Sequence, residues 1–121
     1  MSLLWRVRDE VLMKESKGRS YVALYEKHSP EVARILLWDG KLREQTRALV
    51  VEMAPALRSL VDEKAKPVEI SGEQVAAMDE VLAALQAQAS SELAAEIEQW
   101  RKRLPEFEGQ TAREIWELLS K

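Results

Sequence analysis

Apolar side chains recur every three or four residues along most of the chain, a spacing that places them on one face of an α-helix. The clearest examples are residues 3–15, 42–62 and 72–104 and the stretch after Thr111. No segment alternates apolar and polar residues in the way a half-buried β-strand does. The pattern predicts an all-α protein, a compact bundle of about six or seven helices in a single domain over residues 1–121.

The densest apolar stretch runs from Gly18 to Gly40, and we expect the other helices to converge on it. Its first half places four side chains on one helical face: Tyr21, Leu24, Tyr25 and His28. Ser29 followed by Pro30 fits an N-cap and a first helical residue, where the missing proline N–H costs nothing. The sequence therefore predicts two short helices that meet at a bend at Ser29-Pro30 and end at Asp39-Gly40.

The helices on either side of this stretch are predicted from periodicity together with glycine and proline. Residues 3–15 form a first helix, and Gly18 in the turn after it takes the left-handed conformation that ends many helices. Residues 42–62 keep a helical period through Pro55, which cannot donate to the carbonyl four residues earlier. We therefore expect a kink or a break near residues 53–54.

A charged linker at residues 64–69 separates the half over residues 1–62 from the half over residues 70–121. Directly after it, Ser71 and Gln74 have the spacing of a capping box, in which each side chain bonds the backbone of the other. The residues before and after this box fit a hydrophobic staple between Ile70 and Val75. A helix is therefore expected to begin at Gly72.

The apolar phase of that helix continues to residue 104, so one long helix over residues 72–104 is an alternative. A pair of serines favours a break at residues 89–91, because serine prefers helix caps to helix interiors. Thr111 and Glu114 repeat the capping-box spacing and predict a last helix. We prefer the break, with two helices in place of one.

Size, composition and charge narrow the classes of protein. The chain of 121 residues is long enough to bury a core without disulfides, and it contains no cysteine. Its net charge of −3 and the lack of a run of ~20 apolar residues argue against nucleic-acid binding and membrane insertion. Residues 1–66 hold 13 basic and 10 acidic side chains, whereas residues 67–121 hold 5 and 11. We expect these halves to attract each other across the fold; the alternative is that one face steers a charged partner.

The chain offers little catalytic or metal-binding chemistry. With one histidine and no cysteine, metal ligands would have to be carboxylates, which here fit solvated helix faces better. Catalysis would have to combine His28 with Glu26 or Glu31, but close neighbours in sequence point in different directions on a helix. We therefore interpret His28 as a capping or packing residue, and we predict no catalytic residue, no metal and no cofactor.

Aromatic residues are the better candidates for a binding surface. Trp100 falls on an apolar helical phase and is expected in the core, whereas Trp5 and Trp38 are flanked by charged residues. Tyr21 and Tyr25 fit either the edge of the core or a groove that binds a partner. The candidate partner-binding residues are Trp5, Tyr21, Tyr25, His28 and Trp38.

Short elements between Leu3 and Val50 stand in a recognisable order: Arg8-Asp9, Gly18-Arg19, Tyr21 with Tyr25, Ser29-Pro30, and Leu42-Arg43. Their order and spacing resemble the CFI-box C-terminal helical region of bacterial exported proteins, over about 40% of the chain. The Cys-Phe-Ile segment that names the family is absent, because the chain has no cysteine. Each element also has a structural interpretation, such as turn chemistry for Gly18 and a carbonyl cap for Arg19.

The resemblance implies an appended helical module of a surface or secreted protein, with no activity assigned to any residue. Our first hypothesis is a non-catalytic interaction or structural module from the C-terminal part of a larger exported bacterial protein. Its partner would be the parent protein, a sister subunit in a homodimer, or a helix of another protein. The alternative is a free-standing cytoplasmic adaptor with a groove lined by Tyr21, Tyr25 and Trp38. The third hypothesis is a small hydrolase that uses His28.

Overall fold

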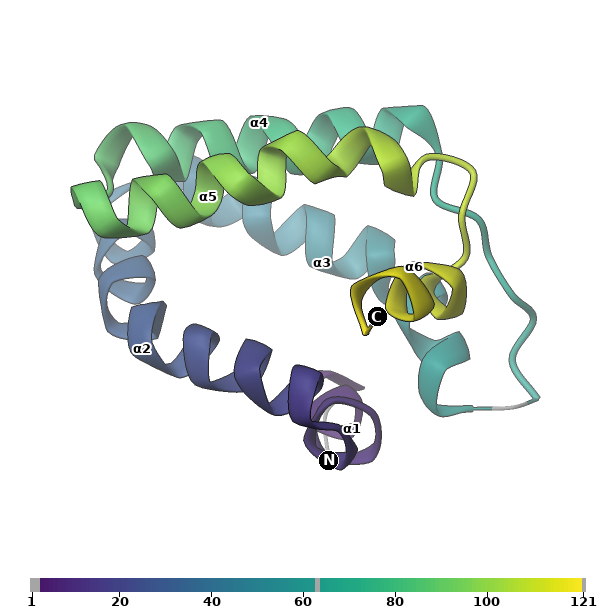
Figure 1. Ribbon diagram of the computed structural model, residues 1–121. Helices are drawn as coiled ribbons and strands as arrows, with labels where there is room; N and C mark the ends of the chain where they lie inside the picture. Colours follow the sequence, from purple (N-terminus) through teal and green to yellow (C-terminus); the bar gives the residue numbers. More distant parts are fainter. Residues whose placement is uncertain (1–2, 63, 121) are drawn as a thin grey trace.

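The computed structural model describes residues 3–62 and 64–120, with only the backbone at Leu4 and Trp5. In this part, the chain forms six α-helices and two short 3-10 helices (Figure 1). The elements are α1 Leu3–Glu10, η1 Leu12–Lys14, α2 Ser16–Trp38, α3 Gly40–Val61, α4 Gly72–Gln88, α5 Ser91–Arg103, η2 Leu104–Phe107 and α6 Ala112–Leu119. The predicted all-α class is confirmed, and the helix count agrees with the expected six or seven.

Helices α4 and α5 lie side by side and cover α3 (Figure 1). Helix α2 joins α3 at the turn at Asp39. One apolar cluster fills the space between these helices: Ile35, Leu42, Val81, Leu85, Leu93 and Ile97. Leu42 is the most deeply buried of them, with 1% of its surface exposed. The cluster includes residues from both halves of the chain.

A second apolar cluster closes the far end of α3: Met53, Ile70, Leu104, Phe107 and Ile115. Leu49 and Leu82 pack against both clusters and connect them. The linker before α4 is fixed to the loop before α6, because the Ile70 N–H donates to the Gln110 carbonyl at 2.8 Å. Gly109 completes this loop with φ at 78°, a conformation that favours glycine.

Helix α2 is one element of 23 residues, so the predicted N-cap at Ser29 is wrong. Pro30 lies inside the helix, where it has no N–H to donate to the Glu26 carbonyl and its ring crowds that turn. Figure 1 shows α2 changing direction part-way along, as helices with an internal proline do. The expected bend is therefore a kink in a continuous helix.

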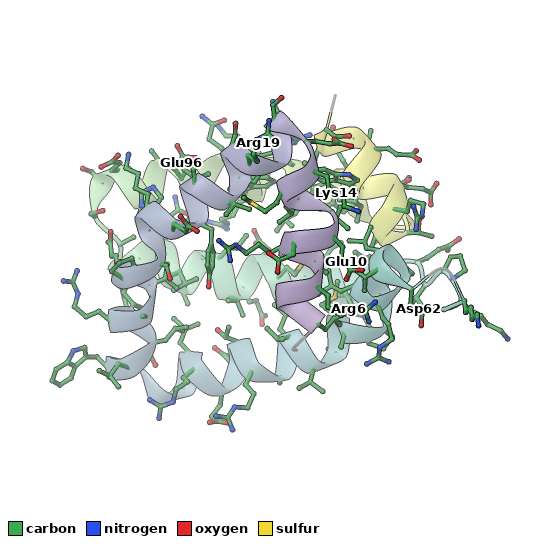
Figure 2. The ribbon with its side chains drawn as sticks, turned by 90° about the horizontal axis from the view of Figure 1, so that it is seen from below. Arg6, Glu10, Lys14, Arg19, Asp62 and Glu96 are labelled. Atoms are coloured by element: carbon green, nitrogen blue, oxygen red, sulfur yellow. The ribbon has the colours of Figure 1, made fainter. Side chains whose placement is uncertain are left out.

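The first and third helices also differ from the prediction. The first helix ends at Glu10, and the 3-10 turn η1 replaces the rest of the expected segment 3–15. Arg6 fixes α1 against the end of α3, because it donates to the Val61 carbonyl at 3.1 Å and pairs with Glu10 at 2.9 Å (Figure 2). Helix α3 continues through Pro55 without interruption, so a break there is excluded.

Gly18 does not end a helix but lies in the first turns of α2, so its predicted left-handed role is wrong. A Cβ atom on Gly18 would lie 2.0 Å from the carbonyl oxygen of Leu12. Glycine is required at this position because it lets the backbone of η1 approach α2. Arg19 is a carbonyl cap, as one interpretation predicted, and donates to the Met13 carbonyl at 3.3 Å.

The boundaries of the C-terminal helices are confirmed. Ser71 Oγ accepts from the Gln74 N–H at 3.1 Å, and Gln74 Oε1 accepts from the Ser71 N–H at 2.9 Å. Thr111 and Glu114 form the same reciprocal pair at 3.2 and 2.9 Å. Ser90 caps α5 through its hydroxyl, so the helix is interrupted at residues 89–91 and the alternative of a single long helix is wrong.

One salt bridge between described residues joins the two halves of the chain. Among the salt bridges of the described residues, only that between Lys27 of α2 and Glu92 of α5 joins the halves. Arg101 and Asp79 pair at 2.7 Å, but both belong to the C-terminal half. The halves are also joined by the apolar clusters and by hydrogen bonds, such as those from Ser90 to Glu31 and from Gln88 to Asp39.

Candidate functional site: a groove on helix α2

A groove of about 200 Å³ runs along α2 and is lined by six of its residues: Tyr25, His28, Ser29, Val32, Ala33 and Leu36. We call it the α2 groove. Its lining spans the kink, since three of the residues precede Pro30 and three follow it. The kink at Pro30 therefore sets the shape of the groove.

The wall of the α2 groove is mainly apolar. Val32 and Leu36 are half-buried and pack against the cluster around Leu42, which gives the groove a rigid base. Ala33 is exposed, and the side chain of Tyr25 is also open to solvent, with 72% of the residue surface exposed. An exposed aromatic ring beside an apolar trough is the arrangement expected of a protein-binding surface.

His28 is the most deeply buried residue of the lining, with 9% of its surface exposed. Its Nε2 atom is enclosed and has no hydrogen-bond partner among the described residues. A neutral imidazole has one donor and one acceptor nitrogen, so this ring leaves one polar atom unpaired. His28 contributes a packed wall rather than a hydrogen-bonded cap, in agreement with its interpretation as a packing residue.

The carboxylates around His28 are engaged with other groups. Glu31 accepts from the Ser90 backbone N–H at 2.5 Å and from its hydroxyl at 2.8 Å, and these hydrogen bonds lower the pKa of the Glu31 carboxyl. Hydrogen bonding to Lys27 lowers the pKa of Glu92 in the same way. Among the described residues, neither carboxylate hydrogen-bonds to His28.

Glu26, which the sequence also placed beside His28, pairs instead with Arg8 at 3.1 Å. In the part of the chain that the structure describes, the hydroxyl of Ser29 makes no hydrogen bond to the imidazole. A nucleophile, a base and an orienting group in mutual contact are what acyl-transfer chemistry requires. The groove instead offers shape and apolar surface.

The other aromatic candidates lie elsewhere. Tyr21 donates its hydroxyl to the Leu119 carbonyl at 2.8 Å and packs edge-to-face against Trp100 and Trp116, with ring centroids 5.6 and 6.4 Å away. Trp38 is 82% exposed at the end of α2 and does not line the groove. The Trp5 side chain lies outside the described residues. Tyr21, Tyr25 and Trp38 therefore do not form one groove.

Sequence reasoning missed the apolar lining after the kink. Val32 and Leu36 follow His28 at spacings of four and eight residues, so all three lie on one face if α2 is continuous. With a helix break predicted at Ser29, these three residues were not placed on one face, so the groove was not predicted. The signal was present in the apolar period, which continues through Pro30.

The residues that carry the CFI-box resemblance are spread over α1, α2 and the start of α3. Arg8 of α1 forms a salt bridge with Glu26 of α2, and Gly18 lets the backbone of η1 lie close to α2. Pro30 produces the kink in α2. Arg43 donates to the carbonyls at the end of α2 at 3.4 and 3.5 Å, and Leu42 fills the core beneath it. Asp9 is exposed, and its side chain makes no hydrogen bond to another described residue.

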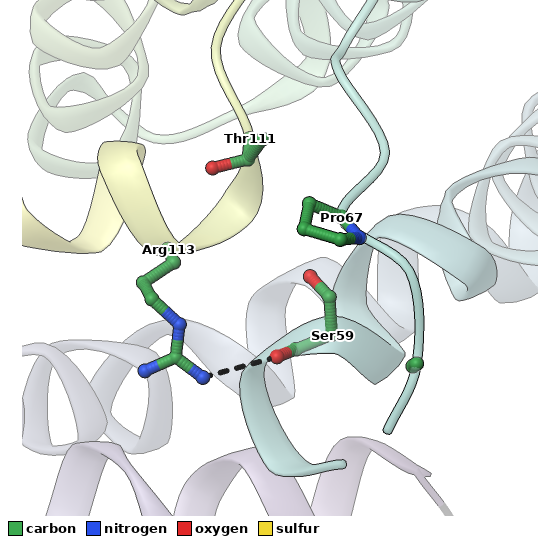
Figure 3. A pocket seen from close by; sticks show the side chains of 5 residues that line it. Ser59, Pro67, Thr111 and Arg113 are labelled. Carbon is green, nitrogen blue, oxygen red and sulfur yellow. Dashed lines mark hydrogen bonds between the residues drawn. The ribbon is translucent and has the colours of Figure 1, made fainter. Parts of the chain in front are cut away.

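A second hollow of about 280 Å³ lies between α3, the linker and α6, lined by Ser59, Ala65, Pro67, Thr111 and Arg113 (Figure 3). Its polar groups already have partners. Arg113 donates to the Ser59 carbonyl at 3.2 Å, the Ser59 hydroxyl donates to the Ala56 carbonyl, and Thr111 caps α6. These hydrogen bonds connect the elements around the hollow, so we assign it a structural role.

Within residues 3–62 and 64–120, no group of three or more acidic or histidine side chains has the geometry to hold a metal ion. None of the helices described there is long and apolar enough to cross a membrane. Comparisons of the chain with protein-family models, with curated proteins and with solved structures find no match.

Proposed function

We propose that the chain is a non-catalytic helical interaction module that binds an apolar segment of a partner protein in the α2 groove. The observation that carries this proposal is the uncovered apolar lining around Tyr25, on a base that is packed into the core. An amphipathic helix places side chains at i, i+3 and i+4 into such a trough. The volume of the groove suits one or two of these side chains.

The resemblance of residues 3–50 to the CFI-box region supports a second part of the proposal. It suggests that the module belongs to the C-terminal part of a larger exported bacterial protein. The runner-up is a free-standing cytoplasmic adaptor that uses the same groove. The open reading frame distinguishes them: an upstream domain and signal peptide support the first, and a gene that starts at Met1 supports the second.

The groove is tested by filling it. Ala33 is exposed in the groove, so Ala33→Trp can occupy the trough without disturbing the core. Ala95→Trp adds the same side chain at an exposed position of α5 and is the matched control. An apolar side chain that is buried in a partner contributes about 1.5–3 kcal/mol, so its exclusion weakens binding about 10- to 100-fold.

The measurement is affinity capture from cells of the native source with the wild type and both variants, together with the solution mass of each protein. We expect a partner that is retained by the wild type and Ala95→Trp but lost with Ala33→Trp. If the partner is a sister subunit, the wild-type mass doubles and Ala33→Trp restores the monomer. Equal capture by all three proteins, with unchanged mass, would contradict the proposal.

A further inference from the structure

A second uncovered surface lies at the turn between α2 and α3. Helix α2 ends at Trp38 and α3 begins at Gly40, so Asp39 alone connects them. This turn forms an edge of the molecule (Figure 1). Leu37 and Trp38 are 69% and 82% exposed there, two adjacent large apolar side chains without cover. We call the surface formed by Arg34, Leu37, Trp38, Lys41 and Arg43 the α2–α3 corner.

The basic residues of the corner are available to an anionic partner. Arg34 precedes Trp38 by four residues, so the two side chains share a helix face. Arg43 donates to the carbonyls of Leu36 and Leu37, which holds its guanidinium beside the exposed pair. Among the described residues, neither of these arginines forms a salt bridge, and the same holds for Lys41 and Arg47.

Two carboxylates nearby offset part of this positive charge, because Glu31 interacts electrostatically with Arg34, and Asp39 with Lys41. Asp39 accepts from the Leu42 N–H at 3.0 Å through one carboxylate oxygen and from Gln88 at 2.9 Å through the other. Residues 31–47 contain four basic and three acidic side chains, so the positive excess is one charge, and the third acidic residue is Glu44. The corner therefore combines an exposed tryptophan and leucine with an excess of positive charge.

We propose that the α2–α3 corner docks on the surface of an anionic phospholipid bilayer. The indole ring of Trp38 and the side chain of Leu37 enter the headgroup region, where amphipathic aromatic rings are favoured. The basic residues contact the lipid phosphates, to which clusters of Lys and Arg are attracted. This contact lies at the membrane surface and requires no spanning helix. It is independent of the α2 groove, because the groove is lined by other residues.

The projecting geometry favours a lipid surface over a protein groove. A protein that received Trp38 would need a pocket and fixed carboxylates matched to cations on two helices. A bilayer interface adapts to projecting side chains, and its phosphates move toward the charges. A second copy of the same corner is disfavoured, because its basic residues would face like charges across the contact.

The test is co-sedimentation of the full chain with vesicles of pure phosphatidylcholine and of phosphatidylcholine with phosphatidylglycerol. We expect binding to the anionic vesicles that weakens as salt rises. The double variant Leu37→Ser/Trp38→Ser should lower the bound fraction about tenfold, because surface binding scales with apolar area and electrostatic attraction. Val51→Ser, which changes an exposed apolar residue of α3 outside the corner, is the matched control.

Several outcomes would overturn the docking proposal. These are no sedimentation with either vesicle, equal binding to neutral and anionic vesicles, or an equal loss with Val51→Ser. Loss of a captured protein partner by the double variant, without vesicle binding, would make the corner a protein-binding surface. Ala33→Trp should leave vesicle binding unchanged, so failure of the groove proposal and failure of the corner proposal are separable. Urea unfolding of every variant confirms that the fold is retained.

Discussion

Helix α2 begins in a different way from α3 and from the helices of the C-terminal half, since Asp39 caps α3 by accepting from the Leu42 N–H. Helices α4, α5 and α6 each begin at a serine or threonine whose hydroxyl accepts from a backbone N–H. Helix α2 begins at Ser16, its N-cap residue Glu15 makes no side-chain cap, and the helix contains an internal proline. Its shape instead depends on contacts with η1, α5 and α6. Local hydrogen bonds therefore define the C-terminal helices, whereas tertiary contacts define α2 and leave part of its surface open.

Truncating a side chain in the core that both halves share should destabilise α2 and the C-terminal helices alike. We expect this change to have the largest effect on the free energy of unfolding. Leu42→Ala takes away a side chain that both halves bury, with 1% exposure. Such changes cost about 2–5 kcal/mol in the free energy of unfolding because of lost burial and the cavity left behind. Urea unfolding monitored by circular dichroism measures the loss. Leu37→Ala, at an exposed position nearby, is the control, and similar losses for both variants would contradict the assigned core.

The next largest effect should come from the close approach that shapes the start of α2. Gly18→Ala places a Cβ 2.0 Å from the Leu12 carbonyl oxygen, so η1 must shift, at a cost of about 1–3 kcal/mol. Gly40→Ala adds the same methyl group where the nearest atom is 3.6 Å away, and should stabilise by about 0.4–1 kcal/mol. Thermal unfolding should therefore shift in opposite directions for the two variants. A shift in the same direction would show that η1 does not pack as described.

Serine and threonine substitutions sharpen the comparison at smaller cost. Ser71→Ala and Thr111→Ala each remove a capping box and should destabilise by about 1 kcal/mol. Ser29→Ala should cost nearly nothing, because Ser29 lies inside α2 and caps no helix. The free energy of unfolding of the three variants decides this. A loss at Ser29 as large as that at Ser71 would restore the two-helix description of α2.

The smallest effect concerns pH. The Ser90 N–H lowers the pKa of Glu31, and the Leu42 N–H lowers that of Asp39, so both carboxyls bind protons less readily in the folded state. Their contribution is complete above the pKa of unfolded carboxyls, about 4, and is lost as pH falls below it. Urea midpoints should therefore drop between about pH 5 and pH 3. The urea midpoint of Glu31→Gln should fall less over this pH range than that of the wild type. Identical pH profiles would show that Glu31 does not contribute to the pH dependence.

Much of the fold was predictable because its signals are local. The capping boxes at Ser71 and Thr111 and the serine break before α5 need only a few neighbouring residues, and their helices begin as predicted. Ser29-Pro30 carries the same local signal but lies inside a helix. Val22 before this pair and Ile35 after it are both buried, and their burial in one continuous helix outweighs the local cap signal. Sequence alone does not show whether the local signal or the burial decides the structure.

The candidate site was predictable only in part, for the same reason. Tyr25 and His28 were identified from their helical face, and both line the groove. Val32 and Leu36 join them only when α2 continues through the proline, so the lining depended on the mispredicted boundary. The exposure of Trp38 depends on how sharply the chain turns at Asp39, which hydrophobic periodicity does not describe.

The contact of Tyr21 with α6 has a consequence for the order of folding. Its hydroxyl bonds a carbonyl 98 residues further along the chain, so the connection closes a very long loop. Loop closure carries an entropic cost that rises with length, and contacts of this kind form after the intervening segments are in place. We therefore expect the contact between Tyr21 and α6 to form late in folding. Because Trp100 and Trp116 both flank Tyr21, intrinsic fluorescence offers a direct optical record of that step.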